Sequence, residues 1–199
     1  MAPDPQQPGR RERNKQEKLR RITEAASRLF ADRGVDEVTT QEIAEAADIG
    51  TGTLFLYAKN KGELLLMVQN STYTDALARG SAEAAGLDDP LDAIMAIVRP
   101  VVECNRTQVD NGRTYLREMV FGDPEEPHHR EALELNARTE AAIADVLGRD
   151  GRSTPDEARA LAAVVSGVMF LAMAPTLTAG RPVDEILAGV AGQVRLLLR

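Results

Sequence analysis

The fold is decided by residues 39–65, which read TTQEIAEAADIGTGTLFLYAKNKGELL. Thr39 followed three residues later by Glu42 is a capping-box pattern, and it predicts that a helix begins here. The residues that this helix would bury are Ile43, Ala44 and Ala47. Asp48-Ile49-Gly50 predicts a short turn, and a second helix over about residues 51–58 follows it directly. Two short helices joined by such a turn are typical of a helix-turn-helix.

The segments on both sides of this stretch also have helical patterns. A helix over about residues 13–33 precedes it and ends at Gly34. The apolar face of that helix would consist of Leu19, Ile22, Ala26, Leu29 and Phe30. Asn60 is a suitable N-cap for the next helix, with Glu63 in the third position, and this helix fades near Gly86. Later helices are expected over about residues 90–109, 115–121, 129–148, 155–178 with Thr154 as a cap, and 184–198, with a break at Gly112. Strand patterns are absent, so we predict an all-α fold.

Basic charge is concentrated near the N-terminus, although the whole chain is acidic with a net charge of −7. Residues 9–33 contain nine basic and four acidic side chains, and all four lysines lie within the first 61 residues. A local excess of cations is the pattern that a DNA backbone attracts. A solvated helix face can have the same composition, so charge alone leaves both interpretations open.

The composition favours a globular protein of the cytoplasm. The 199 residues are 43% hydrophobic and 28% charged, and the single cysteine, Cys104, rules out an intrachain disulfide. The N-terminus lacks the apolar region of a signal peptide, so the cytoplasm is the expected compartment. Residues 160–180 carry no charge and are long enough to span a bilayer. Their alanines, Ser166, Thr176 and Thr178 favour a helix buried in protein instead, and we expect no membrane span.

The second helix of the pair carries the side chains that base contacts need. Gly52 permits close approach of the backbone, and Thr53 can hydrogen-bond a base edge or touch a thymine methyl. Leu54 would anchor the helix inward. The supporting helix begins near Thr40 and Gln41, where free backbone N–H groups favour a phosphate. Lys61 could contact another phosphate, unless it is an ordinary solvated lysine.

Residues 39–65, together with the preceding LFADRG at 29–34, resemble the DNA-binding signature of the TetR (tetracycline repressor) family. The match covers about residues 15–66, a third of the chain. The resemblance implies a homodimeric transcriptional regulator that binds double-stranded operator DNA and a small-molecule effector. The positions that it assigns to DNA are Thr40, Gln41, Thr51, Gly52, Thr53, Phe55, Leu56, Tyr57 and Lys61.

Four residues depart from the family pattern. Asp48 stands where a turn glycine is usual, although Asp tolerates the left-handed backbone region better than most residues. Gly50 replaces a capping Ser or Thr, so the recognition helix is expected to fray. Phe55 replaces a frequent Tyr and lacks its hydroxyl, and Ala58 replaces a common Phe. Phe55 and Tyr57 could also belong to the core instead of facing DNA.

The resemblance further implies three parts along the chain. These are a disordered arm over residues 1–12, a helix-turn-helix domain over 13–66, and a ligand-binding and dimerisation domain over 67–199. The last two long helices are strongly apolar, which suits a four-helix bundle between two subunits. The predicted interface residues are Leu161, Val165, Val168, Met169, Ala172, Leu187, Val190, Val194 and Leu197. A core within one chain is the alternative.

A ligand cavity is expected in the same part of the chain. The candidate lining residues are Met95, Val98, Val102, Tyr115, Met119, Phe121, Phe170 and Met173. Such residues would select a mainly apolar ligand, although methionines and aromatics at helical spacing can also form ordinary core.

Other chemistries have little support in the sequence. His128-His129 beside Glu125-Glu126 do not form a metal site, because adjacent histidines on a helix point to different sides and flanking prolines indicate an exposed loop. Cys104 has no second thiol to pair with as a redox sensor. No catalytic motif is present, so we expect no enzyme, no catalytic residues and no cofactor.

The sequence therefore predicts a homodimeric repressor that a small, mainly apolar ligand releases from a palindromic operator. Activation in place of repression stays open. A helical protein-interaction adaptor that does not bind DNA is the alternative.

Overall fold

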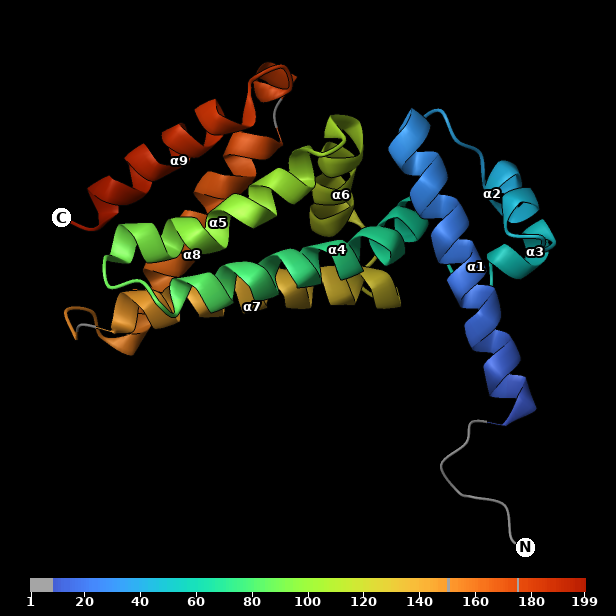
Figure 1. Cartoon of the computed structure of the whole chain (residues 1–199), viewed down its shortest axis with the longest axis horizontal. Helices are drawn as coiled ribbons and strands as arrows, with labels where there is room; N and C mark the ends of the chain where they lie inside the picture. Colours follow the sequence, from blue (N-terminus) through green and yellow to red (C-terminus); the bar gives the residue numbers. More distant parts are fainter. Residues whose placement is uncertain (1–8, 150, 175) are drawn as a thin grey trace, which may run out of the picture.

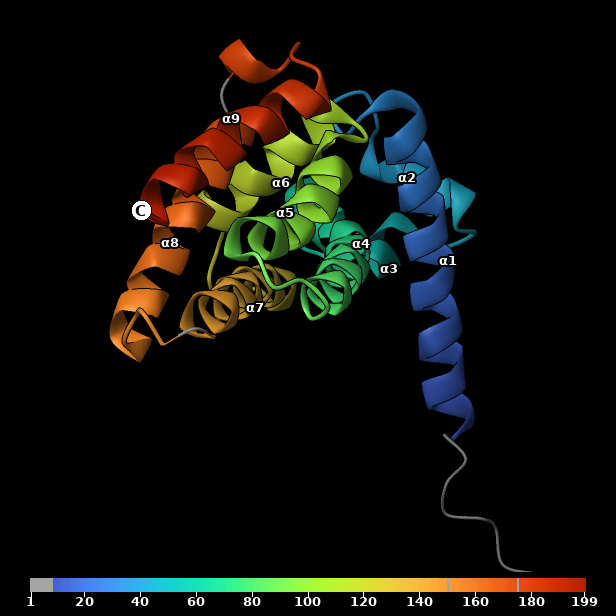
Figure 2. The same cartoon turned by 60° about the vertical axis from the view of Figure 1, so that its left-hand side comes forward.

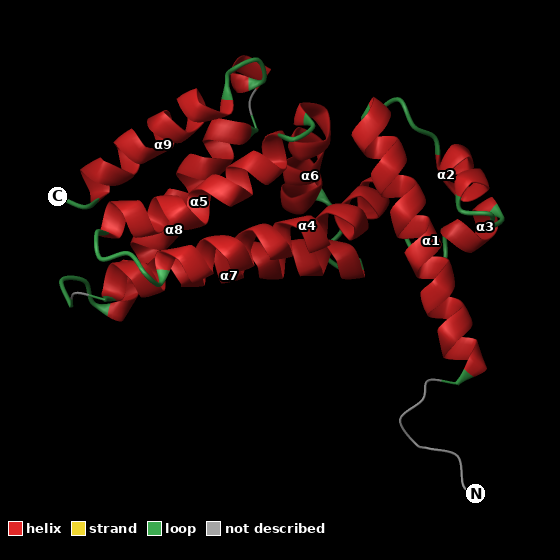
Figure 3. Cartoon of the chain, viewed as in Figure 1, coloured by secondary structure: helices red, strands yellow, loops and turns green. Residues whose placement is uncertain are grey.

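The computed structural model describes residues 9–149, 151–174 and 176–199, apart from the side chain of Leu177, and in these ranges regular structure is entirely helical (Figures 1 and 3). The elements are α1 (Arg10–Arg33), α2 (Thr40–Ala46), α3 (Thr51–Leu54), α4 (Lys61–Ala84), α5 (Pro90–Arg106), α6 (Val109–Phe121), α7 (Pro127–Gly148), α8 (Pro155–Met173), the short 3₁₀ helix η1 (Thr176–Thr178) and α9 (Val183–Leu197). The predicted all-α fold is confirmed.

The N-terminal unit is α1 packed on α2 and on the start of α4. The apolar face of α1 buries Ile22, Ala26 and Phe30 completely or nearly so. Gly34 ends the helix with a φ of 80°, as its position predicts, and its N–H donates to the carbonyl of Phe30.

The capping box at the start of α2 is present. The hydroxyl oxygen of Thr39 accepts a hydrogen bond from the backbone N–H of Glu42, and the Glu42 carboxylate accepts one from the backbone N–H of Thr39. Asn60 caps α4 by accepting from the N–H of Glu63. The side chain of Glu63 does not return to the cap, because it is buried at the junction with α7.

The C-terminal unit is a bundle that α4 joins to the N-terminal unit (Figures 1 and 2). Helices α5 and α7 lie against α4, α8 packs on α7, and α9 lies over α5 and α8. Because α4 runs from 61 to 84, it crosses the predicted domain boundary at residue 66. Because α4 belongs to both units, a tilt of this helix displaces residues in each of them.

Several helix ends differ from the sequence-based expectation. Helix α1 begins at Arg10 instead of near Arg13, and residues 1–8 of the predicted arm lie outside the described residues. Helix α7 begins at Pro127, because proline suits the first position of a helix, so the following histidines are helical and not in an exposed loop. Helix α8 ends at Met173, earlier than expected.

Gly112 was expected to break a helix, and this expectation is wrong. The residue lies inside α6, where a Cβ atom would come within 2.0 Å of the carbonyl oxygen of Asn105. The glycine is therefore required by the close approach of α5 and α6, and not by a chain break.

In the described ranges, no helix has both the length and the apolarity needed to cross a membrane. The uncharged stretch after residue 160 instead forms α8, which buries Ala162, Val165 and Met169 in the bundle.

Candidate nucleic-acid interface and internal cavity

The turn between α2 and α3 is built around two unusual residues. Asp48 has a φ of 52°, so it adopts the left-handed conformation expected of it at this position. Its carboxylate lies 3.1 Å from Nη1 of Arg21 on α1. Gly50 precedes α3 and offers no side-chain cap. Helix α3 ends at Leu54, shorter than the expected helix to Ala58, although the N–H of Ala58 still donates to the carbonyl of Leu54.

Residues 51–57, which we call the recognition segment, form an exposed ridge over a buried anchor. Leu54 is 1% exposed and holds the segment to the core, as predicted. Gly52 is exposed with open space around it, and Thr51 and Thr53 are half-buried. Phe55 and Leu56 are 44% and 83% exposed, so Phe55 does not belong to the core. Large apolar side chains left in solvent beside a glycine indicate a surface that a partner covers.

The end of the recognition segment lies against α1. Tyr57 is half-buried, and its hydroxyl donates to the backbone carbonyl of Lys15 at 3.4 Å. This contact uses the tyrosine hydroxyl within the protein, so the ring acts as a support for the segment.

The remaining predicted DNA contacts lie at helix N-termini. Thr40 is the first residue of α2, and the exposed Gln41 donates to Glu45 at 2.9 Å. Lys61 is the first residue of α4, and its Nζ donates to the carbonyl of Asp36 at 3.2 Å. A lysine ammonium has three donors, so this bond leaves two for another acceptor.

Glu42 reinforces the start of α2. The Arg33 guanidinium donates to its carboxylate at 2.9 Å, and the backbone N–H and hydroxyl of Thr39 donate to the other oxygen. The hydrogen bond from Arg33, followed by those from Thr39, lowers the pKa of Glu42 from 4.5 to about 2.

Helix α7 contacts the recognition segment directly. Nε2 of His128 lies 3.2 Å from the carbonyl oxygen of Tyr57, and Glu126 forms an ion pair with Lys59. Glu63 is buried beside these groups, and burial raises its pKa. The next residue, His129, points elsewhere, with Nε2 3.0 Å from the carbonyl of Met119.

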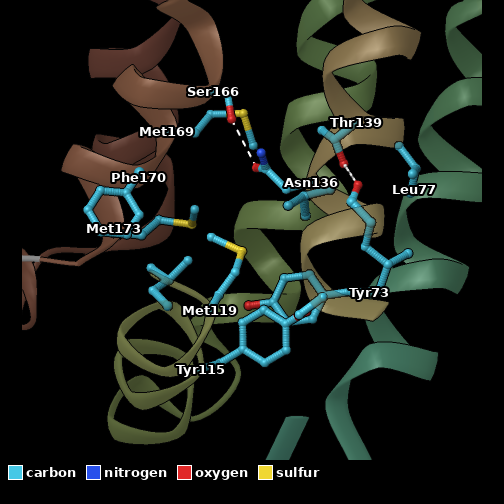
Figure 4. Close-up of a pocket in the computed structure, with 14 residues that line it drawn as sticks. Tyr73, Leu77, Tyr115, Met119, Asn136, Thr139, Ser166, Met169, Phe170 and Met173 are labelled. Atoms are coloured by element: carbon cyan, nitrogen blue, oxygen red, sulfur yellow. Dashed lines mark hydrogen bonds between the residues drawn. The ribbon is translucent and has the colours of Figure 1, made fainter. Parts of the chain in front are cut away.

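An internal cavity of about 60 Å³ lies in the C-terminal bundle between α4, α6, α7 and α8 (Figure 4). Of the predicted lining residues, the structure brings Tyr115, Met119, Phe170 and Met173 together there. It does not bring Met95, Val98, Val102 or Phe121, because the two valines are fully buried in the α5 core and Phe121 is 80% exposed. The remaining residues around the cavity are Tyr73, Leu77, Val101, Leu116, Ala132, Leu135, Asn136, Thr139, Ser166 and Met169.

Sequence reasoning missed the polar wall of this cavity. Asn136 on α7 and Ser166 on α8 lie together at one side of it, where the serine hydroxyl donates to Oδ1 of Asn136 at 3.1 Å (Figure 4). Tyr73 and Tyr115 stack with their ring centroids 4.3 Å apart. Burial raises the pKa of both phenols. The sequence does contain a signal for this polar wall, because Asn136 and Ser166 each lie in the middle of an otherwise apolar helix face.

A hydrogen-bonded series leads from this cavity to the recognition segment. The Tyr115 hydroxyl donates to Oδ1 of Asn70 at 2.9 Å, and Nδ2 of Asn70 donates to the backbone carbonyl of His128 at 3.0 Å. The ring of His128 then contacts the carbonyl of Tyr57. A separate contact ties α6 to the end of α1, where Asn111 bonds to the backbone of both Phe30 and Val35.

Five of the nine predicted interface residues point into the core of the single chain, and the other four are partly exposed. Val165, Met169, Leu187, Val190 and Val194 are at most 4% exposed, so they form core within one subunit. Leu161, Val168, Ala172 and Leu197 are partly buried against the same core. An apolar helix shows no polar face in its sequence, so the side that points inward could not be identified.

Comparison with known proteins agrees with this geometry. Residues 22–68 match the model of the bacterial regulatory proteins of the tetR family, which spans the described helix-turn-helix. This part of the chain, about a quarter of its length, is similar to the tetR family of transcriptional regulators. The family consists of regulatory proteins, which supports the expectation of a regulator rather than an enzyme.

Individual regulators are also similar to this chain. The transcriptional regulator TtgR of Pseudomonas putida is 29% identical over 137 residues, which are 65% of this chain. The chain spans 60% of the length of TtgR. The uncharacterised regulator YuxN of Bacillus subtilis is 36% identical over 63 residues, 32% of this chain and 22% of YuxN.

Solved TetR-family structures have the same fold. FadR of Thermus thermophilus, solved with lauroyl-CoA, superposes with a TM-score of 0.71 at 23% identity, over 90% of this chain and 93% of FadR. AibR, solved with isovaleryl coenzyme A and operator DNA, has a TM-score of 0.60 at 18% identity, over 89% and 97% of the two chains.

Proposed function

We propose that this protein is a homodimeric repressor whose recognition segment binds the major groove of a palindromic operator. The observation that carries the proposal is the exposed Gly52–Leu56 ridge held on the buried Leu54. A glycine and a threonine at the start of a short helix suit base contacts, and the N-termini of α2 and α4 suit phosphates. The family match over residues 22–68 supports the same assignment.

The exposed face of α8 and α9 is the proposed surface between the two subunits. It is apolar and made of small and large side chains: Ala163, Val164, Gly167 and Leu171 on α8, with Gly189, Gly192 and Leu196 on α9. Leu171 is 67% exposed and Leu196 is 59% exposed in the single chain. Glycines allow two helices to approach closely, and pairing two copies would cover these leucines.

The proposed effector is a small, mainly apolar molecule with one polar group. Methionine and aromatic side chains surround the cavity, and the Asn136–Ser166 pair supplies its polar contact. FadR and AibR were solved with acyl-CoA ligands, and RolR, with a TM-score of 0.66, was solved with resorcinol. Ligands this different on similar folds mean that the effector of this chain must be argued from its own lining residues.

The size of the cavity indicates how a ligand would release the protein from DNA. A volume of about 60 Å³ holds only a few water molecules, so a ligand would need the bundle to open. A ligand that binds only the opened bundle shifts the population toward it. The Tyr115–Asn70–His128–Tyr57 series would carry this change to the recognition segment, with a coupling of about 1–3 kcal/mol.

The purified full chain, incubated with fragmented genomic DNA, tests this proposal. We expect recovery of fragments that share a palindrome, and an affinity that falls steeply with salt. Leu171→Asp should produce monomers in sedimentation and weaken operator binding, whereas Leu133→Asp, which changes an exposed leucine on α7, should leave the dimer intact. Absence of DNA binding at low salt would favour the adaptor alternative.

A further inference from the structure

The N-terminal half of α1 projects beyond the rest of the protein. The buried residues of this helix begin at Ile22, and every residue from 10 to 20 is exposed. Figures 1 and 2 both show the N-terminal end of α1 extending past α2 and α3. Eleven residues extend a helix by about 16 Å. Burial of apolar side chains does not account for this extension of the helix.

The projecting half carries a stripe of cations on one side. Arg11, Lys15 and Lys18 are separated by four and three residues, so they lie along one face of the helix. Continuing the same spacing leads to Ile22, Ala25 and Leu29, which pack on the core. The face of α1 that is apolar against α2 and α4 therefore becomes basic where the helix leaves them. We call Arg11, Lys15 and Lys18 the basic stripe.

In the part of the chain that the structure describes, the charges of the basic stripe form no ion pair. Among the described residues, no carboxylate lies within ion-pair distance of any of the three. Glu17 is bound to Arg20 at 2.5 Å, and Glu12 lies one residue away from the line of the stripe. By contrast, Arg20 and Arg21 are both paired with acidic residues. The basic stripe is thus an uncompensated positive surface.

The recognition segment lies beside this stripe. The hydroxyl of Tyr57 reaches the backbone carbonyl of Lys15 at 3.4 Å, so the end of the segment touches the middle of the projection. Arg11 is about one helical turn further out and Lys18 about one turn further in. A duplex in contact with residues 51–57 would pass within reach of long basic side chains here.

We propose that the basic stripe binds the phosphate backbone of the duplex whose bases face the recognition segment. This inference rests on the proposed function and adds a second DNA-contacting surface to it. The contact at Lys15 favours DNA over an acidic protein or an anionic membrane, because it fixes the stripe next to the base-reading ridge. Phosphate contacts carry no sequence information, so the stripe supplies affinity and the recognition segment supplies specificity.

A pair of charge-matched triple variants tests this proposal. The first, Arg11→Gln with Lys15→Gln and Lys18→Gln, removes the stripe. The second, Arg10→Gln with Arg13→Gln and Arg28→Gln, removes three exposed cations from other sides of the same helix. Each full-length protein is titrated by fluorescence anisotropy against a duplex recovered from genomic DNA and against a scrambled duplex, over a range of salt concentrations. Circular dichroism checks that both variants keep their helices.

The expected result is a change in the salt dependence and not in the sequence preference. Loss of the stripe should lower the slope of log affinity against log salt by about 1 per cation in each subunit. Affinity for both duplexes should fall on the order of a hundredfold at low salt, so their ratio stays unchanged. The second variant should keep a slope close to that of the wild type.

Three other outcomes have distinct meanings. Equal salt slopes in the two triple variants would overturn the proposed phosphate contact, because they would show only a long-range effect of net charge. A loss confined to the selected duplex would also overturn it, since phosphate contacts do not discriminate between sequences. If the wild-type protein shows no salt-dependent DNA binding, the proposed function itself fails, and the stripe fails with it.

Discussion

Asp48 determines the direction in which α3 leaves α2. Its φ of 52° is a conformation that β-branched residues adopt only under strain, whereas glycine adopts it freely. Asp48→Val should therefore destabilise the protein by roughly 1–2 kcal/mol, while Asp48→Gly should not. Both variants lose the contact with Arg21, so the comparison isolates the backbone. Urea unfolding of the two variants gives the result, and equal stabilities would contradict a strained turn.

Glu42 should make stability depend on pH in the acid range. The pKa of Glu42 falls from 4.5 to about 2 in the folded protein, chiefly because Arg33 donates to it. A lowered folded-state pKa gives stability that is present above pH 4.5 and is lost as the pH falls toward 2. The unfolding free energies of wild type and Glu42→Gln should therefore converge over this interval. Curves that stay parallel from pH 5 to 2 would exclude this role, and Glu45→Gln on the same helix is the control.

Individual residues could be predicted where the signal is local. Gly34, Thr39 and Asp48 were identified from the sequence because caps and turns depend on neighbours within a few positions. Asn70 and His128 were not assigned to the junction, since their partners lie 58 and 71 positions away along the chain. Long-range polar contacts leave no periodic pattern.

The N-terminus of the recognition helix α3 has no side-chain cap. Gly50 has an ordinary extended conformation with open space around it, so a serine fits there and can accept from the free N–H groups of α3. Gly50→Ser should stabilise the segment by a few tenths of a kcal/mol and raise operator affinity. Gly50→Ala fills the same space without an oxygen and should give no gain. Equal effects of serine and alanine in thermal unfolding and DNA titration would rule out the missing cap.

Helices could be predicted as elements, but their mutual orientation could not. Periodicity and caps predicted the helices α1, α2, α4 and α7, and Thr154 as a cap predicted the start of α8. Five of the residues that we assigned to an interface on α8 and α9 are buried within the chain, because sequences that are apolar on nearly all sides do not reveal which side points inward. Four of the eight predicted cavity residues line the cavity. The polar wall was not predicted, because it depends on how α7 and α8 face each other.

At the scale of the whole molecule, the central question is whether the cavity and the recognition segment communicate. The Tyr115 hydroxyl donates to Asn70, which in turn donates to the backbone carbonyl of His128, so loss of the hydroxyl and loss of the His128 ring that contacts Tyr57 should not have additive effects on operator binding. In a double-mutant cycle, Tyr115→Phe and His128→Ala should show a coupling of about 0.5–3 kcal/mol.

The matched control for this cycle is Tyr73, which stacks on Tyr115 but bonds to Asn105 instead of Asn70. Tyr73→Phe with His128→Ala should be additive within about 0.5 kcal/mol. Coupling of equal size in both cycles would indicate general loosening of the bundle, and would contradict a route through Asn70.

The base-reading role of the recognition segment is tested most directly by measuring the affinity of Thr53→Ala for an operator duplex and for its scrambled sequence. Thr72→Ala, an exposed threonine on α4, is the control. The account predicts that Thr53→Ala lowers the preference for the operator about tenfold, as for one lost base contact, while binding to scrambled DNA and the behaviour of Thr72→Ala stay unchanged. An unchanged preference, or an equal loss on both duplexes, would contradict base reading by residues 51–57.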